Sequence, residues 1–378
     1  MMGVLMFLLV ILKVLGAAET CSCTSSPYCR CVGQGLTSIP PDLPTSIIGL
    51  NLGQNLITTL SQSDFSEYRN LETLELPQNR ISVINSQPFY HLSSLTNLYL
   101  NNNRITALSP DMFTGLGNLE RLELESNKII DIQAKTFSST PNLVRLTLFS
   151  NNLIRLRVDM FTGLGNLQGL YLNNNNITDI QTGTLNPTPE LRYLDLNNNQ
   201  IHSIPSNLLA NLLQLTELRL NENDIKIFPF EDLSKIQRIS LLYLNNNQMT
   251  TLPSLAYEIL SSISTVNIDN YPWQCDCRMV DFKLKMTEPR SFDKQITCSQ
   301  PDSLSGQNLI KVNPGDLMTD CQKPNITRFE RIENYLLIQG ETLRLVCEAS
   351  GIPTPDITVR LPSGLEFNAT VYYCQLEG

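Results

Sequence analysis

Hydrophobic positions recur every 24 residues through most of the chain. Ten successive rows of this length follow one another without insertion or gap. They begin at Ile47, Leu71, Leu95, Leu119, Leu143, Leu167, Leu191, Leu215, Ile239 and Ile263. Each row follows the order L-x-x-L-x-L-x-x-N-x-I-x-x-I. A fixed period of about 20 to 50 residues is typical of a repeat architecture, in which each row is one structural unit stacked on the next.

The x-L-x-L-x segment of each row predicts a short strand. Side chains alternate between the two faces of a strand, so both leucines point to one side. One row alone cannot bury its leucines, whereas stacked rows form a parallel sheet over a continuous core. The strands are packed about 4.8 Å apart and the rest of each row is wider, so the stack is expected to curve. The sheet then lines the concave face.

Two further columns of the repeat are predicted to be structural. The first holds asparagines at the ninth place, where a buried amide must bond to backbone groups as the chain turns out of the strand. They are Asn55, Asn79, Asn103, Asn127, Asn151, Asn175, Asn199, Asn223 and Asn247. The second is a bulky apolar column on the convex side, expected to be a packing spine between rows rather than a ligand site. It comprises Phe65, Phe89, Phe113, Phe137, Phe161, Leu185, Leu209, Leu233 and Tyr257.

The repeat resembles that of extracellular leucine-rich-repeat proteins. This resemblance implies an α/β-type leucine-rich-repeat solenoid with a curved parallel sheet, a mostly irregular convex side and disulfide caps. The alternating tail after Pro324, described below, predicts that a truncated all-β immunoglobulin-like module follows it. The expected organisation is a signal peptide at 1–18, a cysteine-rich N-terminal cap at 19–46, the solenoid at 47–270, a cysteine-rich C-terminal cap at 271–322 and an abbreviated immunoglobulin-like domain at 323–378.

The N-terminal cap carries two closely spaced pairs of cysteines. A solenoid needs caps because its terminal leucines would otherwise be open to water. Cys21, Cys23, Cys29 and Cys31 resemble the N-terminal flank of the family, although the family usually spaces its first cysteines more widely. The connectivity is therefore open. Crossing pairs, Cys21 with Cys29 and Cys23 with Cys31, avoid strained two-residue loops.

The C-terminal cap matches the family more closely. Residues 271–277 read YPWQCDC, and Cys298 and Cys321 follow. The resemblance implies disulfides that join Cys275 to Cys298 and Cys277 to Cys321. Zinc is the alternative for closely spaced cysteines. The chain has only two histidines, neither near the cysteine groups, so we expect neither a metal nor any other cofactor.

The N-terminus predicts export. Residues 4–12 form an unbroken apolar run, well short of the about 20 residues that a membrane-spanning helix requires. Gly16, Ala17 and Ala18 are the small residues that signal peptidase accepts. No later segment approaches a membrane span, so we expect a secreted, extracellular protein in which disulfides persist. Three Asn-x-Thr sequons fit a glycoprotein. They begin at Asn176, Asn325 and Asn368.

After Pro324 the apolar period changes to alternation. Residues 371–374 read VYYC and resemble the immunoglobulin strand that carries the second core cysteine, and residues 340–351 resemble the strand that carries the first. A disulfide between Cys347 and Cys374 is therefore expected. The tail is much shorter than a complete domain of about 100 residues. Several strands are missing, and we expect a weakly stable or partner-dependent module.

Composition and motifs exclude several functions. Lys and Arg number 27 against 36 for Asp and Glu, and the net charge of -9 argues against nucleic acid as the partner. The sequence contains no H-E-x-x-H, G-x-S-x-G, G-x-G-x-x-G or Walker A motif. Glu123 and Glu125 lie two apart on a strand among other polar residues, which is typical of solvated surface rather than of a glycosidase pair. We therefore expect no enzyme.

The candidate binding residues lie on the concave face, where side chains vary from row to row while the framework does not. Tyrosine and arginine on rigid strands dominate interface hot spots because they offer large contact area at low entropic cost. The alternative is scattered surface aromatics without a ligand. The predicted ligand-binding residues are Tyr99, Arg121, Glu123, Arg145, Phe149, Tyr171, Tyr193, Asp195, Arg219 and Tyr243.

The overall prediction is a secreted, non-catalytic recognition protein. Resemblance to proteins with leucine-rich repeats and immunoglobulin domains implies innate immune recognition of microbial surfaces, or alternatively adhesion or neuronal guidance through a protein partner. Matrix organisation is a third class. The partner is then an extracellular protein or a microbial surface, and the formation of a homodimer is left open.

Overall fold

The computed structural model describes residues 21–23, 27–319, 321–331, 343–352, 357–360, 366–369 and 374–376. The predicted signal peptide lies outside this part of the chain. The chain divides into two compact units. The first comprises Met1–Met249 with Ile259–Asn270, and the second comprises Thr250–Glu258 with Tyr271–Gly378.

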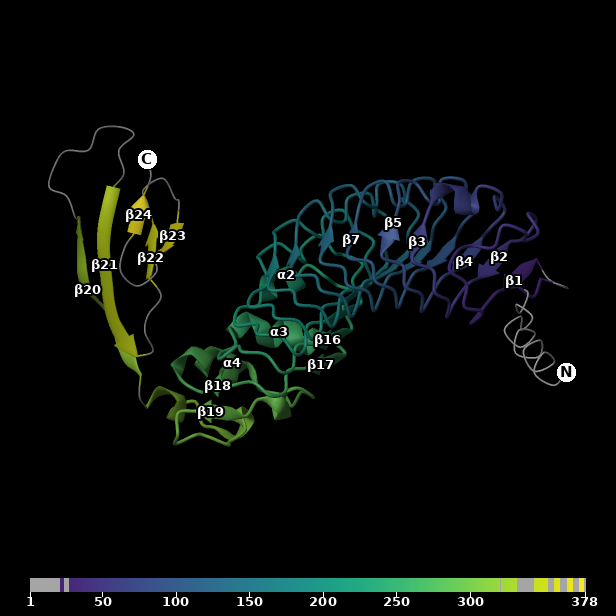
Figure 1. The fold of residues 1–378 in the computed structure, drawn as a ribbon. Coiled ribbons are helices and arrows are strands. Elements are labelled where there is room, and N and C mark those ends of the chain that lie inside the picture. Colours follow the sequence, from purple (N-terminus) through teal and green to yellow (C-terminus); the bar gives the residue numbers. More distant parts are fainter. Residues whose placement is uncertain are drawn as a thin grey trace, which may run out of the picture. The chain divides into compact units, whose positions relative to one another are not determined.

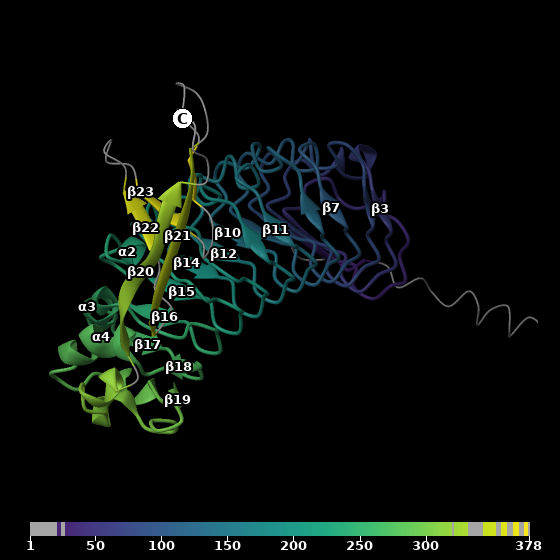
Figure 2. The same ribbon diagram turned by 90° about the vertical axis from the view of Figure 1, so that its left-hand side faces the viewer.

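The first unit is a coil of stacked rows whose strands form one 11-stranded sheet (Figures 1 and 2). The strands are β1 (Tyr28–Arg30), β2 (Gly49–Asn51), β4 (Thr73–Glu75), β6 (Asn97–Tyr99), β8 (Arg121–Glu123), β10 (Arg145–Thr147), β12 (Gly169–Tyr171), β14 (Tyr193–Asp195), β15 (Glu217–Arg219), β16 (Leu241–Tyr243) and β17 (Thr265–Asn267). All neighbours are parallel, and Arg145 stands opposite Arg121 on one side and Gly169 on the other. The leucine-rich-repeat solenoid is confirmed, and its parallel register keeps the period of the sequence.

The predicted leucines form the core of this unit. In the row that begins at Leu95, for example, Leu98 and Leu100 are both fully buried. The side chain between them, Tyr99, lies on the opposite face of the strand and is half-buried. Because the same alternation recurs in successive rows, the core is continuous from row to row. The side chains on the other face of the sheet are not part of this core.

The asparagine column is buried and bonds to the backbone as predicted. Asn151 shows the pattern: its Nδ2 donates to the carbonyl oxygens of Leu124 and Leu148, both at 3.0 Å, and its Oδ1 accepts the N–H of Ile129 at 2.9 Å. Each such amide ties its own row to the row before it. Asn55 does the same for the N-terminal cap, since its Nδ2 donates to the Cys31 carbonyl at 2.7 Å.

The convex side is made of turns, short strand pairs and short helices. The strand pairs are β3 (Thr59–Leu60) with β5 (Val83–Ile84), β7 (Ala107–Leu108) with β9 (Asp131–Ile132), and β11 (Arg155–Leu156) with β13 (Asp179–Ile180). The helices are the 3-10 helix η1 (Gln62–Phe65), α2 (Phe230–Leu233) and α3 (Ser254–Ser262). Phe113 and Phe137 are fully buried and their rings stack at 6.0 Å. The prediction of a packing spine is confirmed.

The disulfides of the N-terminal cap correct the crossing pairs expected from the sequence. Cys21 is bonded to Cys31, and Cys23 to Cys29. The reason is an antiparallel bridge, in which the N–H of Arg30 donates to the Ser22 carbonyl at 3.0 Å and the reverse bond is 2.9 Å. Antiparallel pairing places the outer cysteines opposite each other and the inner cysteines likewise, so the bonds are nested. The cap also supplies β1, a strand that the repeat pattern did not predict.

The second unit contains the C-terminal cap. Its elements are β18 (Trp273–Gln274), η2 (Cys277–Met279), α4 (Val280–Lys285), η3 (Asp293–Gln295), β19 (Cys298–Gln300), η4 (Leu309–Lys311) and η5 (Asp316–Met318). The disulfides Cys275–Cys298 and Cys277–Cys321 are both present, which confirms the predicted pairing. Tyr271 stacks on the buried Trp273 ring at 4.5 Å, so it is part of the cap core.

The tail is an antiparallel all-β module. Strands β20 (Gln322–Arg331), β21 (Leu343–Ile352) and β24 (Cys374–Leu376) form one sheet, and β22 (Ile357–Arg360) and β23 (Glu366–Ala369) form another. An immunoglobulin domain places its two core-cysteine strands in facing sheets. Here β24 pairs directly with β21, with Leu345 opposite Cys374. Cys347 is buried, but the Cys374 side chain lies outside the described residues, so their disulfide stays a prediction.

Candidate ligand-binding surface

The predicted binding residues lie on the solvent side of the concave sheet, because they occupy the third, fifth and seventh places of the rows. Seven consecutive strands, from β6 to β16, carry nine of them, and Phe149 follows β10. Their side chains are half-buried, except for Asp195, which is 5% exposed. They are less exposed than the sequence suggested because the tyrosines and arginines among them pack on neighbours in the next row.

Tyrosine and arginine side chains pack on one another along this face. We call the set formed by Tyr99, Arg121, Arg145, Tyr171, Tyr193, Arg219 and Tyr243 the tyrosine–arginine ladder. Its centre is the contact between the Tyr171 and Tyr193 rings, whose centroids are 4.6 Å apart. The Arg145 guanidinium lies 4.3 Å above the Tyr171 ring. Arg219 lies 5.6 Å and 5.1 Å from the rings of Tyr193 and Tyr243. Such contacts hold flexible side chains in place before a ligand arrives.

A glycine allows this packing at the centre of the ladder. Gly169 begins β12 and stands two residues before Tyr171 on the same face. A Cβ atom at Gly169 would lie 3.1 Å from Cε2 of Tyr171, so the ring lies over the bare backbone. A larger side chain at this position would have to shift the ring. Glycine here is explained by close packing rather than by an unusual backbone conformation.

Most charges on this face have a partner. The Nε of Arg121 donates to Glu123 at 2.7 Å, and the Nε of Arg219 donates to Glu217 at 2.5 Å. Glu217 was not among the predicted residues, although its third-place position in the row could have indicated it. The Tyr99 ring lies 5.5 Å from the Arg121 guanidinium. These contacts make the two ends of the ladder nearly neutral.

Asp195 is the most deeply buried member of the predicted site. Its Oδ2 accepts the Tyr193 hydroxyl at 3.1 Å and its Oδ1 accepts the Asn197 N–H at 3.0 Å. Burial raises the pKa of Asp195 and outweighs these two hydrogen bonds, which act in the opposite direction. Burial, reinforced by the Asp195 charge, also raises the pKa of Tyr193. Asp195 therefore orients Tyr193, and its carboxylate has little surface left for a ligand.

This environment predicts a pH dependence of stability. Because the pKa of Asp195 is raised in the folded protein, the folded state holds the proton more tightly than the unfolded chain, where the pKa is about 3.9. The resulting stabilisation is full below that value and is lost as the pH rises through the folded pKa. We expect the free energy of unfolding of the wild type, relative to Asp195→Asn, to fall as the pH rises from about 3.5 to 7.

Urea unfolding across this pH range measures the difference. Asp179→Asn is the matched control, since the Asp179 side chain is 55% exposed and its removal takes away the same charge without a buried site. A difference between the wild type and Asp195→Asn that stays constant or grows with pH contradicts the assignment.

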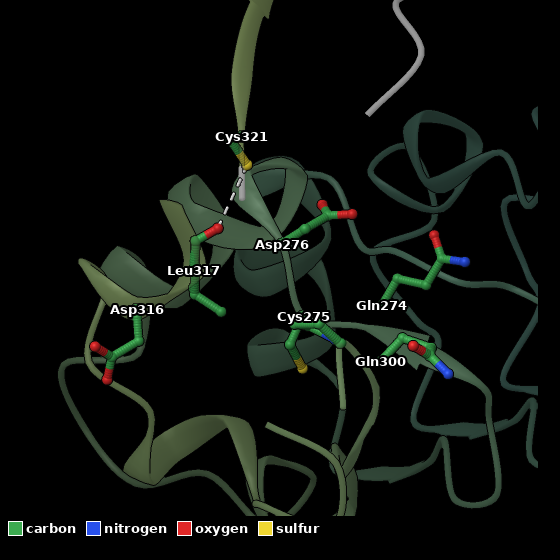
Figure 3. A pocket seen from close by; sticks show the side chains of 8 residues that line it. Gln274, Cys275, Asp276, Gln300, Asp316, Leu317 and Cys321 are labelled. Atoms are coloured by element: carbon green, nitrogen blue, oxygen red, sulfur yellow. Dashed lines mark hydrogen bonds between the residues drawn. The ribbon is translucent and has the colours of Figure 1, made fainter. Parts of the chain in front are cut away.

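A groove and a pocket lie outside the concave face, and several of the residues that line them make structural hydrogen bonds. A shallow polar groove runs along the start of the strands and includes Asn118, Asn142 and Asn166. Their Nδ2 atoms donate to backbone carbonyls of the preceding row at 2.9 to 3.0 Å, so they form a second asparagine column. Figure 3 shows a small pocket in the C-terminal cap beside both disulfides; one of its carboxylates, Asp276, already accepts the Arg278 backbone N–H at 3.0 Å.

The predicted glycosylation sites are partly described. Asn176 and Asn325 are exposed, whereas the Asn368 side chain lies outside the described residues. Their occupancy stays a prediction. In the described part of the chain no group of three or more His, Cys, Asp and Glu side chains is arranged to hold a metal ion. Every helix among the described residues falls short of the length and hydrophobicity of a membrane-spanning segment.

Comparison with known proteins agrees with the fold. The leucine rich repeat family model matches residues 69–129, 93–154, 141–201 and 189–249. Leucine-rich repeat-containing protein 24 of Mus musculus is 35% identical over 94 residues, which are 24% of this chain and 17% of that protein. Leucine-rich repeat, immunoglobulin-like domain and transmembrane domain-containing protein 3 of Homo sapiens is 30% identical over 112 residues, 28% of this chain and 15% of that protein. The chain thus covers less than a fifth of each relative.

Solved structures show the same architecture. A chain of the octameric complex of Latrophilin 3, Unc5D and FLRT2 has a TM-score of 0.62 and 21% identity, and the match covers 78% of this chain and 97% of that chain. The Drosophila Toll–Spätzle complex has a TM-score of 0.59 and 21% identity, covering 83% of this chain and 49% of that chain. The protein is therefore built on a leucine-rich-repeat solenoid. One of the two relatives is named for immunoglobulin-like and transmembrane domains as well as for such repeats.

Proposed function

We propose that this protein is an extracellular, non-catalytic recognition protein that binds a protein ligand through the tyrosine–arginine ladder. The observation that carries the proposal is the central contact of Arg145, Tyr171 and Tyr193, at 4.3 and 4.6 Å, on adjacent rigid strands. Aromatic and arginine side chains that are already ordered lose little entropy on binding, and such residues dominate interface hot spots. Four disulfides in the described residues favour an oxidising extracellular environment.

The relatives favour a protein partner over a microbial one. The relative matched at 30% identity is named for immunoglobulin-like and transmembrane domains, and one similar solved chain belongs to an octameric complex of three proteins, Latrophilin 3, Unc5D and FLRT2. We therefore place adhesion or guidance, the alternative in the sequence-based prediction, ahead of innate immune recognition. Secretion, the glycans and a role in immunity remain expectations from the sequence.

Replacing Tyr171 with alanine tests the proposal. We expect the variant to bind its ligand about 30-fold more weakly, the loss of about 2 kcal/mol that defines a hot spot. The free energy of unfolding should fall by only about 1 to 2 kcal/mol, because the ring is half-buried and loses one aromatic contact and one arginine contact. Binding is measured by screening the mature chain against displayed host ectodomains and purified microbial cell-wall material.

The matched control is Tyr90→Ala. Tyr90 is a 50% exposed tyrosine outside the concave sheet, and its removal should leave binding unchanged. Equal affinity of the wild type and Tyr171→Ala for every ligand found would refute the proposal. Saturable binding to cell-wall material alone would restore the immune interpretation.

A further inference from the structure

One arginine of the concave face differs from the other two. Arg121 and Arg219 each bond to a glutamate two residues away on their own strand. Arg145 makes no ion pair with any described residue, and its buried Nε atom has no hydrogen-bond partner. The difference has a local cause, since the residue two places along β10 is Thr147 rather than an acid.

The acidic neighbours of Arg145 are already engaged. Glu123, on the adjacent strand, bonds to Arg121. Glu125 accepts the Thr147 hydroxyl at 2.5 Å. On the other side stands Gly169, which has no side chain to offer. The guanidinium is therefore held over the Tyr171 ring with its charge uncompensated, in the middle of the ladder. The Nε atom itself is buried, but the half-buried guanidinium carries a charge that no described residue neutralises, and a ligand carboxylate that reaches its terminal nitrogens gains a charge-assisted hydrogen bond.

We propose that Arg145 receives a carboxylate side chain of the protein ligand. The planar guanidinium matches a carboxylate in a two-point, charge-assisted hydrogen bond. The half-buried Tyr171 and Tyr193 rings beside it, packed on each other and under Arg145, leave their exposed edges to contact an apolar side chain next to the acid. The preferred epitope is thus an aspartate or glutamate adjacent to an aromatic or aliphatic residue. This inference rests on the proposed function, since it describes the partner of the same surface.

The charge of the chain favours a single carboxylate over a polyanion. The net charge is -9, and a sulfated or sialylated glycan would need several free cations along its length. Two of the three ladder arginines are already paired with glutamates. A single acidic side chain needs only Arg145, and solvent ions screen the distant negative charges beyond about 8 Å.

Peptide selection tests this inference even though the natural ligand is unidentified. A phage-displayed random peptide library is selected on the mature, disulfide-bonded wild type and on Arg145→Gln. We expect acidic residues next to apolar ones to be enriched on the wild type and not on the variant. In the best peptide, replacing the acid with its amide should weaken binding to the wild type about 10- to 100-fold and leave binding to Arg145→Gln nearly unchanged.

Two variants separate charge from geometry. Arg155→Gln removes an exposed arginine outside the concave face and should keep the acidic enrichment. Arg145→Lys keeps the charge but lacks the planar two-point geometry, so an intermediate loss is expected. Unfolding midpoints confirm that each variant is folded.

The outcomes that overturn the inference are distinct from those that overturn the proposed function. Two outcomes would refute only the role of Arg145 as a carboxylate receptor. In the first, the selected peptides bind Tyr171→Ala more weakly than the wild type but show no enrichment of acidic residues. In the second, the change from acid to amide weakens peptide binding equally for the wild type and Arg145→Gln. Peptides indifferent to both Tyr171→Ala and Arg145→Gln refute the concave binding surface as well, as does failure to select any peptide. Preference for sulfated or sialylated glycans in a parallel array refutes the choice of a protein carboxylate.

Discussion

Asn151→Ala is expected to lower the free energy of unfolding by about 4 kcal/mol. The amide satisfies the carbonyl oxygens of Leu124 and Leu148 and the N–H of Ile129. All three bonds are buried. An alanine leaves these groups without their partner, at about 1 to 3 kcal/mol each, and some of the loss is recovered by relaxation of the turn. Because stability in a repeat protein is a sum over rows and their interfaces, the damage should centre on adjacent rows.

Chemical unfolding measures the total loss, and hydrogen exchange of residues 119–166 locates it. Asn152→Ala is the matched control: Asn152 is the next residue and is exposed, so the change should be within about 0.5 kcal/mol. Asn151→Asp keeps an acceptor for Ile129 but points a carboxylate at two carbonyls, and it should be at least as damaging at neutral pH. A loss for Asn151→Ala no greater than that of the control would mean that the column is not structural.

Phe137→Ala is the second large effect, with an expected loss of about 4 kcal/mol in the free energy of unfolding. Its ring is fully buried and stacks on Phe113 at 6.0 Å, so truncation leaves a cavity between rows of the convex spine. Phe149 is the comparison within the same chain. It is half-buried at the concave face and makes no ring contact with the ladder among the described residues. Phe149→Ala should cost only about 1 kcal/mol.

The two phenylalanines should also differ in function. We expect Phe149→Ala to weaken ligand binding while lowering the unfolding midpoint by only a few degrees. Phe137→Ala should weaken binding only in proportion to the fraction of protein that it unfolds. Unfolding and binding are measured on the same samples. A Phe149→Ala variant less stable than Phe137→Ala would mean that the concave and convex faces have been exchanged.

Much of the fold was predictable because it depends on contacts that repeat. The leucines at the fourth and sixth places, the ninth-place asparagines and the phenylalanine spine each meet the same neighbour one row away, so one period in the sequence determines them. The nested cap disulfides were not predictable in this way. They depend on an antiparallel bridge between Ser22 and Arg30 that occurs once and has no periodic signal.

Details of the binding surface depend on side-chain directions that the sequence does not contain. The Tyr171 ring lies over Gly169 and under the Arg145 guanidinium. This position depends on the register of the strands and on the absence of a Cβ atom at Gly169. The backbone conformation at the eighth place of each row was not predicted from the sequence, for a different reason. The eighth place of each row has a positive φ, between 49° and 60°. Asparagine often indicates this conformation, but Gln54 and Glu222 adopt it too. The residue types at the eighth place therefore do not by themselves predict its positive φ.

The most direct test of the central claim places a glycan on the concave face. Arg145→Asn creates an Asn-Leu-Thr sequon with Leu146 and Thr147 in the middle of the ladder, and Thr182→Asn creates Asn-Gly-Thr at an exposed site on the convex side. Both variants are secreted from glycosylating cells, checked for glycan by mass, and measured for affinity to the ectodomains that the wild type binds. We expect lost binding for the glycosylated Arg145→Asn and retained binding for Thr182→Asn. Retained binding with a glycan at position 145, or lost binding with one at position 182, contradicts a concave binding surface.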